Sequence, residues 1–309
     1  MKNTCIMKLF VIIASYKGKQ WYDRCFASLR ESTIPVQTIV VDNASDDGSV
    51  EYIRENYPEI ILIENKKNLG FGGANNIAMR YAVDRDCDYV FLLNQDTWIE
   101  PDVIEKLVRI HRRHQEYGIL SPLHIAPDGK HLNMLIDDGK NQYEKNLDLL
   151  GDLLCGTSKD VYPVEYVNAA AWLLPRKTLE IVGGFDPIYF HYEEDDDYLN
   201  RTHYHKLGVG LCPSSRIYHD HTGLFNTMPI SKTRIHRDQL LKVRFANPKN
   251  TESIAKYRRY LLRKTLVLVC RGNKKDAKLL WGDYKFLGVN RKAIENSRME
   301  NSKAKASWL

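Results

Sequence analysis

The strongest constraint on the fold is an apolar run that ends in a carboxylate. Residues 89–93 read Tyr-Val-Phe-Leu-Leu, and Asn94, Gln95 and Asp96 follow them directly. A near-continuous apolar run of this length is typical of a strand buried on both faces, as in the parallel sheet of an α/β protein. Ligands of such proteins bind beyond the carboxyl ends of the strands. The run therefore predicts the fold class and puts Asp96 where a ligand would bind.

Strand-like and helix-like segments alternate through the first half of the chain. Apolar runs at 9–14, 38–41 and 60–63 predict three further strands, and the second of these ends at Asp42 and Asn43. Residues with the apolar spacing of a helix follow each run. Because strand and helix alternate, we expect right-handed crossovers and a mostly parallel central sheet flanked by helices.

The first apolar run, at 9–14, superficially resembles a secretory signal because Lys2 and Lys8 precede it. It is short, however, and residues 16–19 do not form a small-residue cleavage site, so a buried first strand is the better interpretation. The six cysteines are scattered without a Cys-x-x-Cys pair, which favours a reducing compartment and argues against a thiolate zinc site. No apolar stretch of the sequence is long enough to cross a bilayer. We therefore expect a cytoplasmic protein.

The second half of the chain is less regular, and its charge is uneven. Residues 126–160 are polar, an apolar run returns at 169–174, and the chain is helical and basic from about residue 235 onward. Residues 254–309 hold 15 Lys and Arg against 4 Asp and Glu, a net charge of +11 where the whole chain carries +6. Residues 1–253 are therefore net acidic. The basic segment 254–309 either meets an anionic surface or is a solvated basic face.

Basic and apolar residues are interleaved between Lys256 and Arg271. This stretch is too short to span a membrane, but it suits a helix that lies in the interface of an anionic membrane. The alternative is a packed pair of C-terminal helices, in one chain or at a homo-oligomer interface, whose basic residues are merely solvated.

Three further segments carry residues that suit a binding site. Residues 68–76 form a glycine-rich turn that opens a helix, where close backbone approach and the helix N-terminus favour phosphate. The five acidic residues from Glu193 to Asp197 are flanked by aromatic side chains, and crowded carboxylates raise one another's pKa, as suits a general base. His219 and His221 are alternate residues of an extended segment and can face one site.

Each of these features also has a structural interpretation. Asp96 could cap the helix that follows Pro101, the acidic run could be solvated surface, and a lone histidine is most often a core residue. The glycine-rich turn does not have the spacing of a dinucleotide-binding fingerprint. The features gain weight only in combination.

In combination and in order, the segments resemble the family 2 glycosyltransferases of the GT-A fold, particularly their rhamnosyltransferase-like branch. The resemblance runs from about Leu9 to Gly223. It covers six segments of the chain: Ala14–Lys17, Val40–Ser49, Asn68–Asn76, Leu92–Asp96, Gly183–Asp186 with Glu194–Asp197, and His219. Lys17 in place of an asparagine, and Asn94 and Gln95 before Asp96, depart from the family's pattern.

The resemblance implies a domain organisation and an activity. Residues 1–234 would form the catalytic domain, with a nucleotide-binding half at 1–125 and an acceptor-binding half at 126–234, and 235–309 would form a helical, basic C-terminal extension. The implied enzyme is an inverting hexosyltransferase that uses a nucleotide-diphosphate sugar, with dTDP-rhamnose as the first choice and a UDP-hexose as the second. The implied acceptor is an oligosaccharide or a lipid-linked glycan of bacterial surface polysaccharide synthesis, which would hold the enzyme on the inner face of the plasma membrane.

The resemblance also implies roles for individual residues. Asp195 would be the general base, supported by Glu194 and Asp197. Asp96 and His219 would hold Mg²⁺ or Mn²⁺, with His221 as the less favoured alternative to His219. Trp172 and Glu194 would contact the acceptor. The residues that would bind the nucleotide sugar are Ser15, Tyr16, Asp42, Asn43, Asn75, Gln95 and Asp96.

Two other classes of protein stay open. A metal-dependent phosphoryl-transfer or nucleic-acid enzyme could use the same carboxylates, but it predicts basic residues around them, whereas residues 1–253 are net acidic. Nucleic acid is therefore not an expected partner. A non-catalytic glycan-binding relative is disfavoured because both Asp96 and Asp195 are present.

Overall fold

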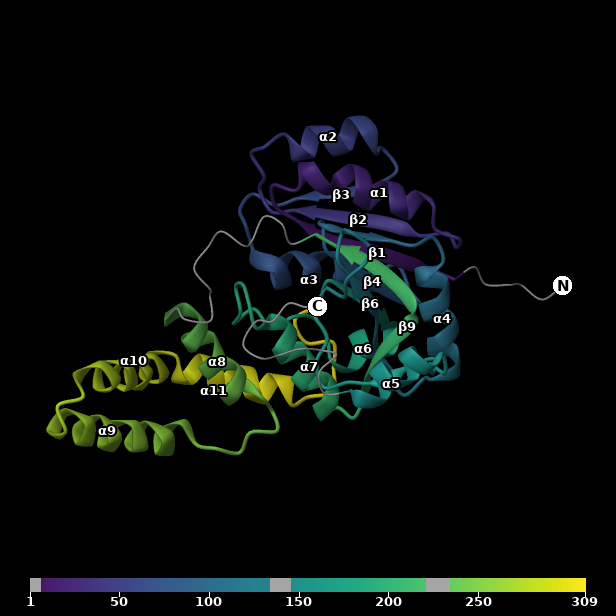
Figure 1. The fold of residues 1–309 in the computed structure, drawn as a ribbon. Coiled ribbons are helices and arrows are strands. Elements are labelled where there is room, and N and C mark those ends of the chain that lie inside the picture. The colour runs from purple at the N-terminus through teal and green to yellow at the C-terminus, as the bar shows by residue number, and fades with distance from the viewer. Residues whose placement is uncertain (1–6, 134–145, 221–233) are drawn as a thin grey trace.

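The computed structural model describes residues 7–133, 146–220 and 234–309. In these ranges nine strands form one sheet, with helices on both faces (Figure 1). The strands are β1 (Leu9–Ser15), β2 (Gln37–Asp42), β3 (Ile61–Glu64), β4 (Tyr89–Leu93), β5 (Thr97–Ile99), β6 (Tyr117–Ile125), β7 (Tyr162–Pro163), β8 (Ala171–Pro175) and β9 (Gly208–His219). Their order across the sheet is β3-β2-β1-β4-β8-β6-β9-β5, with β7 paired to β9.

The sheet is mostly parallel, as the alternating pattern predicts. Strands β1 to β4 pair in parallel, and β9 is parallel to β6. Strand β8, which contains the apolar run at 169–174, is antiparallel to both β4 and β6. The four strands predicted in the first half are confirmed, and β4 has the predicted bounds. The carboxyl ends of β1, β2, β4 and β9 consequently lie at the same edge of the sheet.

Two apolar cores cover the two faces of this sheet. Helices α1 (Tyr22–Arg30), α2 (Ser49–Asn56) and α4 (Val103–Arg113) pack on one face. Helices α3 (Gly70–Val83), α6 (Arg176–Ile181) and α7 (Glu194–Tyr204) pack on the other. In β1, Val11 and Ile13 belong to the first core and Phe10 and Ile12 to the second. Burial of both faces explains why this strand has no polar alternation. A short 3₁₀ helix, η1 (Lys19–Trp21), precedes α1, and α5 (Leu147–Cys155) precedes β7.

The C-terminal extension is helical, as predicted. It comprises α8 (Arg234–Ala246), α9 (Ile254–Cys270), α10 (Lys274–Val289) and α11 (Arg291–Asn301). Helices α9 and α10 form a hairpin that projects away from the sheet (Figure 1). Among the described residues, no helix combines the length and the apolarity that a membrane span requires.

The end of the extension returns to the sheet domain. The backbone N–H of Gly184 donates to the carbonyl of Ser307 at 2.8 Å, and Leu309 packs against the core formed with α3, α6 and α7. The extension is therefore more than an appendage, because its last residues are part of the packing of the sheet domain.

Candidate active site

The sheet brings Asp96 and His219 together from distant parts of the chain. Strand β5 turns back from β4 and pairs with β9, so that Thr97 lies opposite His219. Asp96 Oδ1 is 3.2 Å from His219 Nε2, and the Asp96 carbonyl accepts a hydrogen bond from the backbone of Asp220 at 2.9 Å. The residue before α4 is Asp102, so Asp96 does not cap that helix. His221 lies outside the described residues.

This pair fits a divalent metal ion that also has non-protein ligands. Within the described ranges no group of three or more His, Cys, Asp or Glu is suited to hold a metal. Asp96 Oδ1 is buried, and no described residue donates a hydrogen bond to it. One carboxylate and one imidazole leave most of the coordination sphere to diphosphate oxygens and water, which is how Mg²⁺ and Mn²⁺ are commonly held beside nucleotides.

A second histidine, which the sequence analysis did not single out, supports the first. His124 is buried, and its ring lies 6.2 Å from the ring of His219 in an edge-on arrangement. Its Nε2 is 3.2 Å from Ser121 Oγ, and Asn133 Nδ2 donates to the carbonyl of His219 at 2.8 Å. An isolated histidine in an apolar strand carries no sequence signal that could have revealed this arrangement.

Asp42 has the geometry of a ligand-binding group. It lies at the end of β2, opposite Ser15 at the end of β1. Its Oδ2 accepts a hydrogen bond from the backbone of Ser45 at 2.9 Å. Its Oδ1 is buried and receives no hydrogen bond from any residue in the described parts of the chain. Buried carboxylate oxygens are almost always paired, so this atom is suited to accept from a bound ligand.

Gln95 has a structural position in the site. Its Oε1 accepts from Ser15 Oγ at 2.8 Å and from the backbone of Tyr16 at 3.0 Å, and its Nε2 donates to the Tyr16 carbonyl at 3.1 Å. A Cβ atom at Gly18 would collide with this amide. The Gln95 side chain thus holds the loop after β1, and the exposed ring of Tyr16 is the part of that loop open to a ligand.

Asn43 and Asn75 are buried beneath the glycine-rich turn. Asn43 Nδ2 donates to the carbonyl of Gly70 at 3.1 Å, and its Oδ1 accepts from the backbone of Leu69 at 3.2 Å. Asn75 Nδ2 donates to the carbonyl of Phe71 at 3.0 Å. Gly70 has φ +76, and a Cβ atom there would collide with the carbonyl of Phe190. Both asparagines therefore stabilise the turn, which is close to the loop that leads to the acidic run.

The acidic run begins α7, and two of its residues differ sharply in environment. Glu194 is buried, and burial raises the pKa of its carboxyl to about 8, with a further contribution from Asp195. Asp195 is partly exposed and accepts hydrogen bonds from Tyr166 Oη at 3.3 Å and from the backbone of Asp196 at 2.9 Å. Burial, together with the charge of Asp195, raises the pKa of Tyr166, so this phenol stays a donor. The raised pKa favours the neutral form of Glu194, whereas Asp195 is the more accessible carboxyl group.

Asp197 and Trp172 lie inside the protein. Asp197 accepts from Arg201 Nε at 2.8 Å, and both side chains are 1% exposed. Trp172 is 0% exposed, and its ring stacks on that of Phe185 with 6.4 Å between centroids. Trp172 was expected to contact the acceptor, but in this structure it belongs to the core and has no surface open to one. Asp197 likewise supports α7 from inside through its ion pair.

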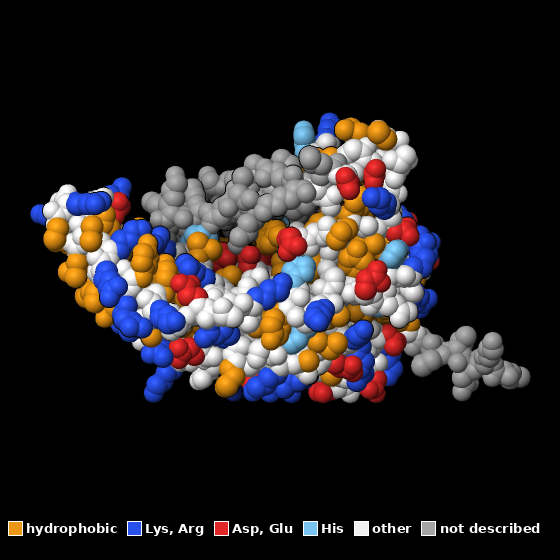
Figure 2. Space-filling view, turned by 90° about the horizontal axis from the view of Figure 1, so that it is seen from below, with side chains coloured by type: hydrophobic (Ala, Val, Ile, Leu, Met, Phe, Trp, Pro, Cys, Tyr) orange, Lys and Arg blue, Asp and Glu red, His pale blue; other side chains and the backbone are white. Residues whose placement is uncertain are grey.

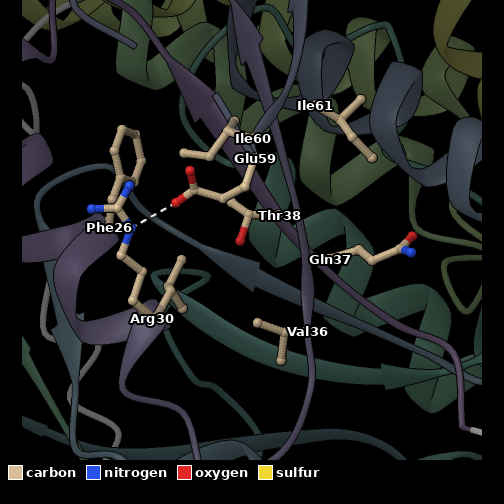
Figure 3. A pocket seen from close by; sticks show the side chains of 9 residues that line it. Phe26, Arg30, Val36, Gln37, Thr38, Glu59, Ile60 and Ile61 are labelled. Atoms are coloured by element: carbon tan, nitrogen blue, oxygen red, sulfur yellow. Dashed lines mark hydrogen bonds and ion pairs between the residues drawn. The ribbon is translucent and has the colours of Figure 1, made fainter. Parts of the chain in front are cut away.

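A cavity of about 390 Å³ lies at the opposite edge of the sheet (Figure 3). Its walls include Thr38 near the start of β2 and Ile61 at the start of β3, and the ion pair between Arg30 and Glu59 lies beside it, with 2.6 Å between Nε and Oε1. None of the predicted site residues lines this cavity. It is therefore separate from the site at the carboxyl ends of the strands.

A mostly parallel sheet with carboxylates at the carboxyl ends of its strands, flanked by helices, has the architecture of the GT-A nucleotide-sugar transferases. Solved structures of that fold are similar to this chain. TarS of S. aureus, solved with UDP-GlcNAc, matches 96% of this chain and 90% of its own with a TM-score of 0.60 at 11% identity. The mannosyltransferase PcManGT of Pyrobaculum calidifontis, solved with GDP-Man and Mn²⁺, matches 96% and 74% with a TM-score of 0.53 at 16% identity.

Sequence comparisons point to the same class of enzyme. The model of glycosyl transferase family 2 matches residues 10–158. A low-salt glycan biosynthesis hexosyltransferase of Haloferax volcanii is 23% identical over 80% of this chain and 76% of its own. The N-acetylglucosaminyl-diphospho-decaprenol L-rhamnosyltransferase of Mycobacterium tuberculosis is 27% identical over 73% of this chain and 80% of its own. These matches support a family 2 glycosyltransferase that is similar to the rhamnosyltransferase-like members of that family.

Proposed function

We propose that this glycosyltransferase moves a sugar, with inversion, from a nucleotide-diphosphate donor to a glycan acceptor. The observation that carries the proposal is a pair of buried carboxylate oxygens at one sheet edge. Among the described residues, Asp42 Oδ1 receives no hydrogen bond, and Asp96 Oδ1 has the imidazole of His219 3.2 Å away. A desolvated acceptor is costly without a partner; the base of a nucleotide would supply one to Asp42, and a divalent ion beside the diphosphate would be held by Asp96 and His219.

We assign the parts of the nucleotide-sugar donor to different residues. Asp42 Oδ1 accepts the N3–H of a pyrimidine base, and the exposed ring of Tyr16 is suited to stack on that base. Asp96 and His219 would hold the metal ion, which would supply positive charge beside the diphosphate. The glycine-rich turn, held by Asn43 and Asn75, presents the N-terminus of α3 to the same region.

Asp195 accepts the proton in the proposed reaction. The acceptor hydroxyl loses its proton to the Asp195 carboxylate while its oxygen forms a bond to the anomeric carbon. The bond from that carbon to the diphosphate oxygen breaks, and its electron pair leaves with the nucleoside diphosphate. Tyr166 orients Asp195 by donating to it at 3.3 Å, and the raised pKa of Glu194 reduces the negative charge beside the base.

The proposed donor is dTDP-rhamnose, with a UDP-hexose as the second candidate. The support comes from the M. tuberculosis relative, whose name describes an L-rhamnosyltransferase acting on a lipid-diphosphate-linked N-acetylglucosamine. Asp42 does not separate the two candidates, because thymine and uracil carry the same N3–H donor. We propose the same class of acceptor, a polyprenyl-diphosphate-linked sugar, for this chain.

A panel of nucleotide sugars, each with and without N-acetylglucosaminyl-diphospho-polyprenol, tests the function. We expect nucleoside diphosphate to be released from dTDP-rhamnose, with acceleration by the acceptor. Release of inorganic phosphate or a nucleoside monophosphate would instead identify a phosphoryl-transfer enzyme. Binding of the panel without any turnover would identify a non-catalytic relative.

We further propose that the α9–α10 hairpin docks the enzyme on an anionic membrane. Apolar side chains of this hairpin are between 39% and 85% exposed: Tyr260, Leu266, Val267, Val269, Leu279, Trp281 and Val289. Figure 2 shows apolar and basic side chains interspersed over the C-terminal helices at the left of the view. Each basic residue near an anionic surface contributes about 1 kcal/mol, so several would hold the protein there reversibly. A membrane-bound acceptor would then be within reach of the site.

Vesicle co-sedimentation tests the membrane proposal. We expect the protein to bind vesicles that contain phosphatidylglycerol, to ignore pure phosphatidylcholine, and to be released by salt. Arg259→Glu with Arg263→Glu should abolish binding, because both side chains are exposed on α9. The control carries the same charge change at the exposed Arg80 and Arg109 of the sheet domain. Failure to bind at low salt, or a stable dimer in sedimentation, would favour the packed or oligomeric alternative.

A further inference from the structure

The end of α11 lies between two buried carboxylates of the catalytic domain. Asn301 Nδ2 donates to Asp186 Oδ2 at 2.9 Å and lies 3.4 Å from Asp197 Oδ1. The hydroxyl of Ser297, one turn earlier, also hydrogen-bonds Asp186 Oδ2. All four side chains are buried. Asp186 and Asp197 stand on either side of the loop and the helix start that carry Asp195, so α11 contacts this segment at both ends.

The orientation of the Asn301 amide is set from outside the acidic segment. Trp308 Nε1 donates to Asn301 Oδ1 at 3.0 Å. An indole nitrogen can only donate, so Oδ1 must face Trp308 and Nδ2 must face the carboxylates. The side-chain amide is therefore fixed by Trp308 at Oδ1 and by the carboxylates at Nδ2. The backbone carbonyl of Asn301 is also 3.1 Å from His205 Nε2, at the end of α7.

The glycines at 183 and 184 allow the chain after α11 to approach. Gly183 has φ +80, and a Cβ atom there would collide with the backbone of Ser307. A Cβ atom at Gly184 would lie 2.9 Å from Leu309 Cδ2, and the backbone N–H of Gly184 donates to Ser307 at 2.8 Å. This pair of glycines thus has a packing partner in the extension itself.

The loop between the two carboxylates needs such support. Tyr192 and Glu193 have φ values of 65 and 68, a left-handed conformation that is unfavourable for residues with side chains and persists only where the surroundings impose it. Helix α8 supports the middle of the loop, where Gln239 Nε2 donates to the carbonyl of His191 at 3.0 Å and Lys242 Nζ to that of Ile188 at 2.8 Å. Helix α11 supports its two ends.

We propose that Asn301 is a positioning residue for the sugar-transfer step: it fixes Asp186 and Asp197 and thereby holds Asp195 in place. The proposal rests on the function proposed for Asp195 above. It makes the C-terminal extension part of the catalytic apparatus, independently of any contact that the extension makes with a membrane. The donor site at Asp42 and Asp96 has no hydrogen bond to Asn301, so donor binding should not depend on it.

The test compares Asn301→Asp with Asn296→Asp. Both residues lie on α11, but Asn296 is exposed, so the control makes the same chemical change away from the carboxylates. In Asn301→Asp the amide group that donates a hydrogen bond to Asp186 is replaced by a further carboxylate. We expect kcat to fall by about 10–100-fold, as for a displacement of a catalytic group by about 1 Å, with the calorimetric Kd for dTDP-rhamnose unchanged. The control should keep both values.

Trp308→Phe is the second variant, because it removes the indole N–H and leaves the ring. It should lower kcat in the same direction by releasing the amide, and it keeps the test available if Asn301→Asp does not fold. Hydrogen exchange in the protein without substrate provides a readout that does not need activity. We expect the amides of residues 187–197 to exchange faster in both variants and at the wild-type rate in the control.

The outcomes separate this proposal from the proposed function. Wild-type kcat and wild-type exchange in folded variants would overturn the positioning role. A parallel loss of donor affinity and kcat would also overturn it, because a general loss of structure would then explain the data. If the wild-type protein turns over no donor of the panel, the proposed function fails, and the exchange rates still decide whether Asn301 holds the loop.

Discussion

Asp195→Asn is expected to lower the transfer rate by roughly 10²–10⁴-fold, the usual loss when a general base is removed. Asparagine keeps the shape of the side chain and can still meet Tyr166 and the backbone of Asp196, but it cannot take a proton at neutral pH. Donor affinity should stay nearly unchanged, since the groups that hold the donor are at the sheet edge. Steady-state kinetics with a calorimetric titration of the donor measure the two effects separately.

Two neighbours serve as controls for this substitution. Glu194→Gln should cost much less, because burial already raises the pKa of Glu194 to about 8 and glutamine resembles the protonated form. Asp196→Asn removes a charge from the same turn of α7 and should leave turnover close to that of the wild type. If Asp195→Asn retains more than about a tenth of the wild-type turnover, the base is another carboxylate of the acidic run.

Asp96→Ala is expected to raise the Mg²⁺ or Mn²⁺ concentration needed for half-maximal activity by at least about tenfold. Loss of a group that only orients a metal ligand typically costs 10–100-fold in affinity, and Asp96 is proposed to be a ligand itself. It is also the one full negative charge among residues 94–96. A metal titration of the activity, together with direct Mn²⁺ binding by electron paramagnetic resonance, measures the change.

His219→Ala should act in the same direction, and the double variant should lose less than the sum of the two single losses, because the two residues serve one ion. Asp102→Ala is the control, since it removes a carboxylate from the nearby start of α4 without touching the pair. An unchanged metal titration in Asp96→Ala, or full activity in excess chelator, would remove Asp96 and His219 from the donor site.

The first half of the fold could be predicted because its strands are short, apolar and buried on both faces. The strand at 89–93 could be predicted from its apolar composition alone. The position of Asp96 at the edge of the sheet followed from its place after that strand. The direction of β8 could not be predicted, because the apolar run at 169–174 is compatible with either direction. Only its pairing with β4 and β6 makes it antiparallel.

The roles of the polar residues depended on contacts that the sequence does not announce. Gln95 lies in a motif that suggests a ligand, yet its amide hydrogen-bonds Ser15 and Tyr16, at and just after the end of β1. Both faces of β8 are buried, so Trp172 lies in a core whichever face it takes, and its ring stacks on Phe185 there. The ion pair of Asp197 with Arg201 could have been predicted from the sequence, because residues four apart on a helix are neighbours.

The contacts of α11 with the acidic segment are the last that a growing chain can make. The strands that end at Asp42 and Asp96, and β9 after them, are synthesised before residues 291–309. A chain still on the ribosome could therefore form the donor edge first, whereas Asp186 and Asp197 must wait for Asn301. We expect such an unfinished chain to bind a nucleotide sugar and to keep it intact, so that transfer begins only after the extension has folded back onto the sheet.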